Sequence, residues 1–194
     1  MKTQIFLIAA LIFAIAAAAA AQRPVQVPFI NDQSTKPLTD LEQFQDTYGA
    51  TLLKGFTELP RVRGTSGNIQ VTIVEFRNAA NNTKVKGVAV DVMTTERPAE
   101  RTRSFIEYSE LEGLIRGITL ISKVDKGSSP LSSLEAVYTT KGEFSISNFF
   151  NWQGESRIAV TTGRYDPKTI LIDQAGQTTL LAELQQAKST LDEL

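Results

Sequence analysis

The same order of hydrophobic patterns occurs twice along the sequence. Each time, short segments in which apolar and polar residues alternate are followed by a segment with apolar residues three and four positions apart. The first pattern is typical of half-buried antiparallel strands, and the second of an amphipathic helix. We therefore predict an α+β fold of two ββββα repeats, with antiparallel sheets each packed with one amphipathic helix.

The two halves align without gaps, first over their strands and then over their helices. A shift of 75 residues places Leu59 and Gly67 on Leu134 and Gly142, and a shift of 66 residues aligns the two helices. The first half is longer between its strands and its helix, and we expect the surplus in a charged loop at 94–104. Internal duplication explains this order. Two stretches that share hydrophobic spacing without common descent are the alternative.

The alternation and the turn composition place the individual elements. The turn-rich run 78–83 lies between two alternating segments, so we predict a hairpin over 68–91. The N-glycosylation sequon that starts at Asn81 lies in this turn and matters only in a eukaryotic source. Fourth strands are expected near 104–108 and 169–173, and the helical stripes cover 111–121, with Ser109 as a candidate cap, and 180–191.

Composition divides the chain into four segments. We expect a signal peptide at 1–21, an extended leader at 22–38, a first unit at 39–126 that begins with a short helix at 40–48, and a second unit at 131–194. The short helix is predicted because Thr39 and Glu42 have the spacing of a capping box and Gly49 follows.

The N-terminal segment predicts export. Lys2 precedes an apolar run from Phe6 to Ala16, and small residues up to Ala21 offer a cleavage site. A membrane anchor is the alternative, because the apolar stretch approaches the about 18 residues typical of a transmembrane helix. We expect cleavage, a secreted or periplasmic mature protein, and no membrane span after cleavage.

The chain has no Cys and no His, which excludes several kinds of chemistry. Disulfides, thiolate nucleophiles, Ser-His-Asp triads and imidazole zinc ligands are all excluded. We expect no cofactor and no metal site. Removal of Lys2 with the signal changes the balance of 20 basic and 21 acidic groups to a net charge of −2. This charge makes nucleic acid an unlikely partner.

Two stretches resemble a group of uncharacterised secreted bacterial proteins. They are 105–115, FIEYSELEGLI, and 136–146, AVYTTKGEFSI. This resemblance implies no activity. The doubled ββββα order is also similar, in topology only, to the Whirly and PC4-type fold that binds single-stranded nucleic acids. The signal peptide and the negative charge argue against transferring that function.

Three carboxylates cluster at the start of the first long helix. Glu107, Glu110 and Glu112 are the residues that a carboxylate-dependent hydrolase would use, since such an enzyme needs two carboxyls about 5–10 Å apart in a cleft. Acidic side chains in a first helical turn also stabilise the helix dipole. We favour this structural role and assign no catalytic residue.

Three aromatic residues lie where the hairpin between Phe144 and Val160 is expected to reverse. Phe149, Phe150 and Trp152 could stack on a sugar or a base, or anchor a protein partner. In the alternative, Phe149 and Trp152 close the end of the core and only Phe150 is exposed.

Three arginines lie in the expected charged loop of the first unit. Arg97, Arg101 and Arg103 could bind an anionic ligand through bidentate contacts. Acidic neighbours at Glu96 and Glu100 indicate the alternative, a solvated loop whose charges compensate each other.

These observations favour an exported, non-enzymatic binding or structural module. Its partner is unknown, and a protein or polysaccharide of the cell envelope is the expected class. A carboxylate-dependent hydrolase and a single-stranded nucleic-acid-binding protein are the alternatives. The hydrolase requires two converging carboxylates in a cavity, and the nucleic-acid-binding protein requires Arg and Lys side chains aligned on one sheet face.

Overall fold

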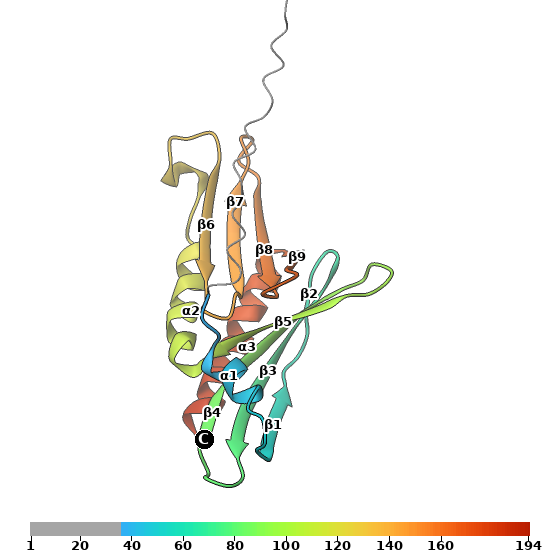
Figure 1. The fold of residues 1–194 in the computed structure, drawn as a ribbon. Coiled ribbons are helices and arrows are strands. Elements are labelled where there is room, and N and C mark those ends of the chain that lie inside the picture. Colours follow the sequence, from blue (N-terminus) through green and yellow to red (C-terminus); the bar gives the residue numbers. More distant parts are fainter. Residues whose placement is uncertain (1–35) are drawn as a thin grey trace, which may run out of the picture. The chain divides into compact units, whose positions relative to one another are not determined.

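A computed structural model describes residues 36–194, which belong to one compact unit. The predicted signal peptide and most of the predicted leader lie outside the described residues. The elements in chain order are α1 (Asp40–Gln45), β1 (Leu52–Glu58), β2 (Val62–Arg63), β3 (Gly67–Asn78), β4 (Lys84–Thr94), β5 (Arg101–Glu107), α2 (Tyr108–Ile121), the 3₁₀ turn η1 (Lys126–Ser128), β6 (Leu134–Thr139), β7 (Ser145–Phe150), β8 (Ser156–Thr162), β9 (Lys168–Ile172) and α3 (Gln174–Asp192). The predicted α+β fold of roughly two ββββα units is confirmed (Figure 1).

The first sheet, sheet A, has the strand order β1-β3-β4-β5, all antiparallel. The predicted hairpin is confirmed as β3 and β4, with Ile69 opposite Val92 and Thr72 opposite Ala89. Strand β2 pairs with β3 on the same side as β1, so the two short strands continue one another along β3. The second sheet, sheet B, has the order β6-β7-β8-β9 and is also antiparallel.

The junction between β1 and β2 is stabilised by a buried amide. Pro60 lies at this junction and has no N–H to donate to the ladder. The Gln70 Nε2 donates to the carbonyl of Leu59, and the Nε of Arg61 donates to Gln70 Oε1 at 3.0 Å. The side chain of Gln70 thus provides a hydrogen bond to the backbone carbonyl of Leu59, between the two short strands.

Each long helix contacts both sheets, which extends the prediction of one helix for each sheet. Helix α2 contacts β4 and β5 of sheet A and β6 and β7 of sheet B, whereas α3 contacts β9 of sheet B and β2, β3 and β4 of sheet A. The two helices also contact each other. Gly117 explains the close approach of α2 to β6, because a Cβ atom there would lie 2.3 Å from the ring of Tyr138.

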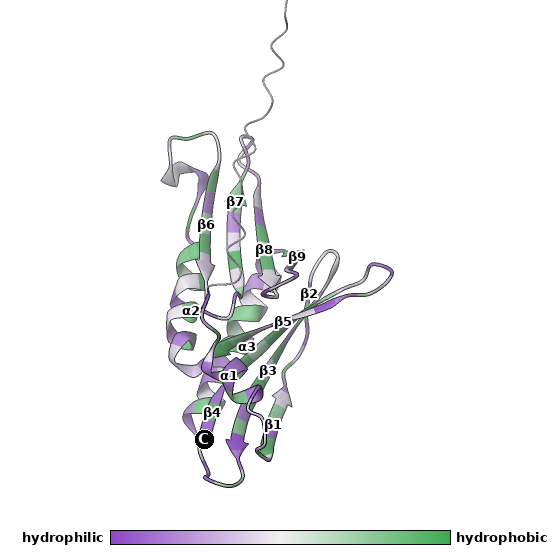
Figure 2. Cartoon of the chain, in the orientation of Figure 1, coloured by the Kyte–Doolittle hydropathy of each residue, from purple (hydrophilic) through white to green (hydrophobic). Residues whose placement is uncertain are grey.

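One hydrophobic core therefore includes residues of both sheets and both helices. It contains the alternating residues of the predicted strands and the apolar stripes of the predicted helices, among them Ile69, Val71, Val88, Val90, Ile146, Val160, Leu114, Ile118, Leu180 and Leu184. Figure 2 shows the change along β5 from hydrophobic residues beside α2 to hydrophilic residues toward the β4–β5 loop.

The short N-terminal helix α1 ends earlier than predicted. Its capping box is present, since Thr39 Oγ1 accepts from Glu42 N at 3.1 Å and Glu42 Oε2 accepts from Thr39 N at 2.7 Å. The helix stops at Gln45, so Tyr48 is 95% exposed instead of lying on a buried stripe. Leu41 is buried against sheet A, where Gly87 leaves space for it: a Cβ on Gly87 would lie 2.7 Å from Leu41 Cδ1.

Candidate functional site

Sheet A has two faces that differ in what covers them. Successive side chains of a strand point to opposite faces, so Ile69 and Val71 face the core shared with the long helices, and Thr72 and Val74 face the other way. We call this second side of sheet A the outer face. Its apolar residues form a separate small cluster with Leu41 of α1, comprising Val74, Phe76, Ala89 and Phe105.

Register and residue size create a hollow on the outer face. Thr72 and Ala89 are small and lie directly opposite each other on β3 and β4. Larger rings lie around them, with Phe76 and Phe105 packed edge to face at 6.2 Å between ring centroids. The resulting cavity measures about 270 Å³. We call it the sheet A groove. Its lining includes Lys54, Phe56, Glu58, Thr72, Ala89, Arg103 and Phe105, with Gln45, the last residue of α1, at its border.

One residue of the groove lining has a buried hydroxyl with no hydrogen-bond partner in residues 36–194. Thr72 is 5% exposed, and its Oγ1 makes no hydrogen bond with the described residues. A buried polar group without a partner costs about 1–3 kcal/mol of folding stability. Thr72 lines the cavity through its other atoms, and the hydroxyl would reach a polar atom of a ligand by rotation of the side chain.

Two arginines of β5 enclose a buried aspartate next to the groove. Asp91 is fully buried and accepts from Arg101 Nη2 at 2.8 Å, from Arg103 Nε at 2.8 Å and from Arg103 Nη2 at 2.9 Å. Burial by itself raises the pKa of Asp91, but the hydrogen bonds and positive charges of both arginines outweigh it and hold the pKa below its usual value. Two guanidinium groups share one carboxylate, so the cluster keeps a positive charge.

The cations of the groove lie over aromatic rings. Lys54 Nζ is 5.4 Å from the centroid of the Phe76 ring, and the Arg103 guanidinium carbon is 5.9 Å from that of Phe105. Within residues 36–194, Lys54 forms no ion pair within 4.0 Å. Phe56, on the edge strand β1, is 72% exposed. The groove thus combines an apolar floor with cationic and aromatic walls.

The predicted arginine loop is only partly a loop. Arg101 and Arg103 lie in β5, because β5 begins at Arg101 and pairs Arg103 with Asp91 of β4. Their charges are compensated by Asp91, and not by the acidic neighbours at 96 and 100. Arg97 lies in the exposed loop between β4 and β5 and does not line the groove. Of the three predicted arginines, the structure places Arg103 in the candidate site.

The predicted aromatic turn is shorter than expected. Phe149 and Phe150 belong to β7, and the chain reverses after them, with Gly154 N donating to the carbonyl of Asn151. Phe150 is 8% exposed and Trp152 is 75% exposed. For these two rings this is the opposite of the alternative stated above, in which Trp152 closes the core and Phe150 is exposed. Figure 1 shows the β7–β8 turn well separated from α1 and β1, so the structure does not bring the aromatic turn to the groove.

The helix-start carboxylates are engaged in structural contacts. Glu107 precedes α2, and its Oε1 accepts from Lys141 Nζ at 2.8 Å and from Asp40 N at 2.9 Å. Glu110 accepts from Lys141 N at 2.8 Å, and Glu112 pairs on the surface with Arg116. Burial by itself raises the pKa of Glu107. The hydrogen bonds from Lys141 and Asp40 outweigh this effect, so the pKa lies below its usual value. A hydrolytic general acid needs a raised pKa instead.

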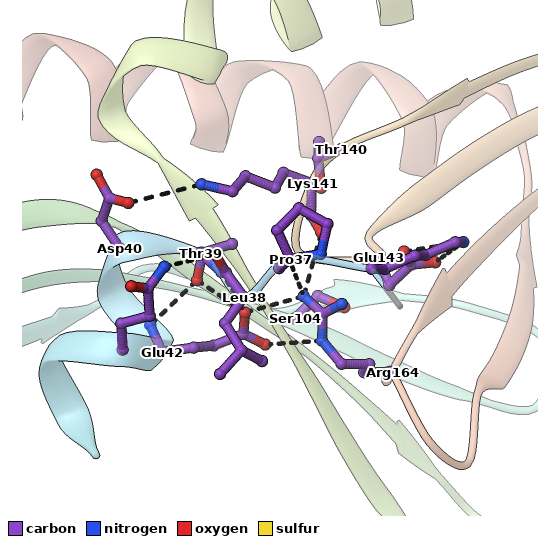
Figure 3. A network of polar contacts seen from close by, with 12 residues as sticks. Pro37, Leu38, Thr39, Asp40, Glu42, Ser104, Thr140, Lys141, Glu143 and Arg164 are labelled. Atoms are coloured by element: carbon purple, nitrogen blue, oxygen red, sulfur yellow. Dashed lines mark hydrogen bonds and ion pairs between the residues drawn. The ribbon is translucent and has the colours of Figure 1, made fainter. Parts of the chain in front are cut away.

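A polar network fixes α1 over the outer face (Figure 3). The guanidinium of Arg164, in the β8–β9 loop, is buried, and its Nη2 donates to Glu42 Oε2 at 2.9 Å and to the carbonyl of Lys141 at 3.2 Å. Lys141 Nζ lies 3.5 Å from Asp40 Oδ1. Side chains in the loops that connect the strands of sheet B therefore position the helix that borders the groove on sheet A.

Sequence reasoning did not identify this network or the groove. Arg164 lies in the run Gly163-Arg164-Tyr165-Asp166-Pro167, whose composition indicates only a turn. The available signal for the groove was the run 71–76, Val-Thr-Ile-Val-Glu-Phe, in which Val74 and Phe76 add apolar residues at the positions that should face solvent. Such a run indicates a strand covered on both faces.

No known protein family, curated protein or solved structure matches the chain. The two resemblances proposed from the sequence therefore stay predictions. Among residues 36–194, no helix combines the length and the apolar character needed to cross a membrane. Within the same part of the chain, no three acidic side chains are placed to hold a metal ion together.

Proposed function

We propose that the chain is an exported, non-enzymatic binding module and that its binding surface is the sheet A groove. The observation that carries this proposal is a cavity whose walls carry Lys54 and Arg103 and whose lining includes Thr72, a residue with an enclosed hydroxyl that has no partner among the described residues. Folding would be more favourable if this position were apolar, so ligand binding offers a reason for the hydroxyl. The ligand belongs to the secreted or periplasmic space, as a free compound or as an exposed group of a protein or polysaccharide of the cell envelope.

The contacts of the carboxylates favour binding over catalysis. Glu107 and Glu110 position α1 and the β6–β7 turn through Lys141, and Glu112 is paired on the surface. The chain also has no His or Cys to act as base or nucleophile. Hydrolysis by these carboxylates would require breaking contacts that hold the fold.

A second candidate function is the binding of a single-stranded nucleic acid. It is favoured by one observation, since Lys54, Arg101 and Arg103 share the outer face of sheet A with the exposed ring of Phe56. Cations next to aromatic rings are the usual platform for single strands. Asp91 and Glu58 reduce the positive charge of this face, so we place this candidate second.

Retention of compounds from an envelope extract tests the proposed function. Purified protein is incubated with the extract, washed, and analysed by mass spectrometry for retained compounds. We expect the natural chain to retain a compound that is lost with Ala89→Leu, which fills the hollow, and with Lys54→Glu, which reverses a wall charge and leaves the core untouched. Ala80→Leu, at an exposed turn position, is the matched control. Identical retention by all four proteins would overturn the proposal.

A further inference from the structure

The structure assigns a ligand class to the groove, an inference that rests on the proposed function. We propose that the groove binds a small carboxylate whose apolar part is an aromatic ring or a branched aliphatic chain. Three properties of the groove carry this assignment: its size, the charge of its walls, and the position of its one unpaired hydroxyl.

The size of the groove sets the size of the ligand. Its volume of about 270 Å³ lies just below the range of about 300–1,000 Å³ in which drug-sized ligands bind. A ring or a branched chain of a few carbons fits over Thr72 and Ala89. Such a group would also cover part of the Phe56 ring, which is 72% exposed at the edge of the groove.

The wall charges match a single negative charge. Lys54 and Arg103 line the groove together with Glu58, and the second arginine, Arg101, balances Asp91. The lining thus has an excess of one positive charge, and Glu58 opposes ligands with several negative charges. Arg103 binds Asp91 through Nε and Nη2, and its side chain is 42% exposed, so its remaining N–H groups can donate to a ligand carboxylate.

The Thr72 hydroxyl is enclosed in the structure, and rotation about the Cα–Cβ bond would turn it toward a ligand in the groove, to which it would supply a neutral hydrogen bond. It can donate to a carboxylate oxygen or accept from a hydroxyl substituent of the ligand. In the protein without ligand this hydroxyl has no partner among the described residues. A bound polar atom would satisfy it, so Thr72 is expected to contribute to affinity although it lowers the stability of the fold.

NMR titration of the isotopically labelled full chain tests the ligand class. The probes are benzoate, 3-phenylpropanoate and 3-methylbutanoate, with 3-phenylpropanamide as the uncharged control and acetate as the control without an apolar group. We expect at least one of the three carboxylates to shift the backbone amides of Thr72 and Ala89 with saturation. The amide control is expected to bind about tenfold more weakly, because it lacks the charge that Lys54 and Arg103 bind.

Two variants test the roles of individual side chains. Thr72→Val keeps the shape of the side chain, and we expect it to raise the melting temperature while weakening the best probe severalfold. Lys54→Gln is expected to weaken the same probe with little change in melting temperature, because within the described residues Lys54 forms no ion pair and its contact with the Phe76 ring, at 5.4 Å, is a weak one. A probe affinity that neither variant changes would overturn the assignment.

The outcomes separate this inference from the proposed function. If no carboxylate binds but the extract compound is still lost with Ala89→Leu, the ligand class is wrong and the binding module stands. If a single-stranded oligonucleotide shifts the same amides and its affinity falls steeply with salt, the nucleic-acid candidate replaces the carboxylate. If nothing shifts these amides and retention is groove-independent, both proposals are overturned.

Discussion

The two faces of sheet A carry different kinds of buried residues. The face toward the long helices contains β-branched aliphatic side chains such as Val71, Val88 and Val90, all fully buried. The outer face contains buried polar groups next to apolar ones, among them Thr72 and Asp91. Buried polar groups contribute less to stability than apolar groups of the same size, and they need partners. The residues of the core face thus favour stability, whereas the outer face keeps the polar groups on which the proposed recognition depends.

The largest effect is expected from truncation on the core face. Ile69→Ala should reduce the free energy of unfolding by about 2–5 kcal/mol, because it removes a fully buried side chain and leaves a cavity. Phe56→Ala, on the exposed edge of the outer face, is the matched control and should change it by less than about 0.5 kcal/mol. Urea unfolding of both variants measures the difference. Equal losses would show that Phe56 is part of the core.

Removal of the ion pair that holds α1 should have the next largest effect. Glu42→Gln leaves the buried Arg164 without its carboxylate, and we expect a loss of about 2–3 kcal/mol together with weaker probe binding in the groove. Glu112→Gln, which breaks the exposed pair with Arg116, should change stability by less than about 1 kcal/mol. Unfolding curves that are the same for both variants would show that α1 does not depend on this pair.

Asp91→Asn tests the charge cluster of the outer face and its dependence on pH. We expect a loss of about 1–3 kcal/mol at neutral pH, because two half-exposed arginines lose their shared carboxylate. The pKa of Asp91 is lower in the folded chain than in the unfolded chain, where it is about 3.9. Its contribution is therefore present above the unfolded value and is lost as the pH falls through the folded one.

Melting temperatures between about pH 7 and pH 2 measure this dependence. The difference between the natural chain and Asp91→Asn should shrink as the pH decreases. Asp46→Asn, at an exposed position after α1, provides the control and should follow the natural chain throughout. A difference that stays constant with pH would mean that the carboxylate charge contributes nothing.

The smallest effect is expected at the β7–β8 turn, where the same contrast between inward and outward residues occurs in sheet B. Trp152→Ser should change stability by less than about 0.5 kcal/mol, because the ring is 75% exposed. Phe150→Ser is the inward control and should cost several kcal/mol. If Trp152 anchors a protein partner, pull-down of that partner will be reduced by Trp152→Ser at unchanged melting temperature. A large loss of stability in Trp152→Ser would show that the ring is packed.

The sequence predicted the core face well because period and burial coincide there. Ile69, Val71 and Ile73 alternate with polar residues, and the structure buries all three. The predicted hairpin and both long helices follow from the same local patterns. These elements depend on residues close together in the chain, so a reading of short windows can find them.

The outer face could not be predicted in the same way because its contacts are distant in sequence. The hollow depends on Thr72 lying opposite Ala89, which requires the exact register of β3 and β4. The border of the groove depends on Arg164 reaching Glu42, 122 positions apart. The charge of Arg103 made it a candidate in the sequence. Its place in β5 depends on pairing with Asp91 of β4, which the sequence around Arg103 does not indicate.

The contacts of each long helix with both sheets have a consequence for how the chain folds. Helix α2 lies between the strands of the two sheets in the sequence and contacts both of them, and α3, the last element, contacts strands from the first half. Either half expressed alone would therefore keep one of the two helices that cover its sheet, lack the other, and expose apolar surface. Residues 36–194 are expected to fold and unfold in one cooperative step, and the first half reaches its final state only after α3 has been synthesised.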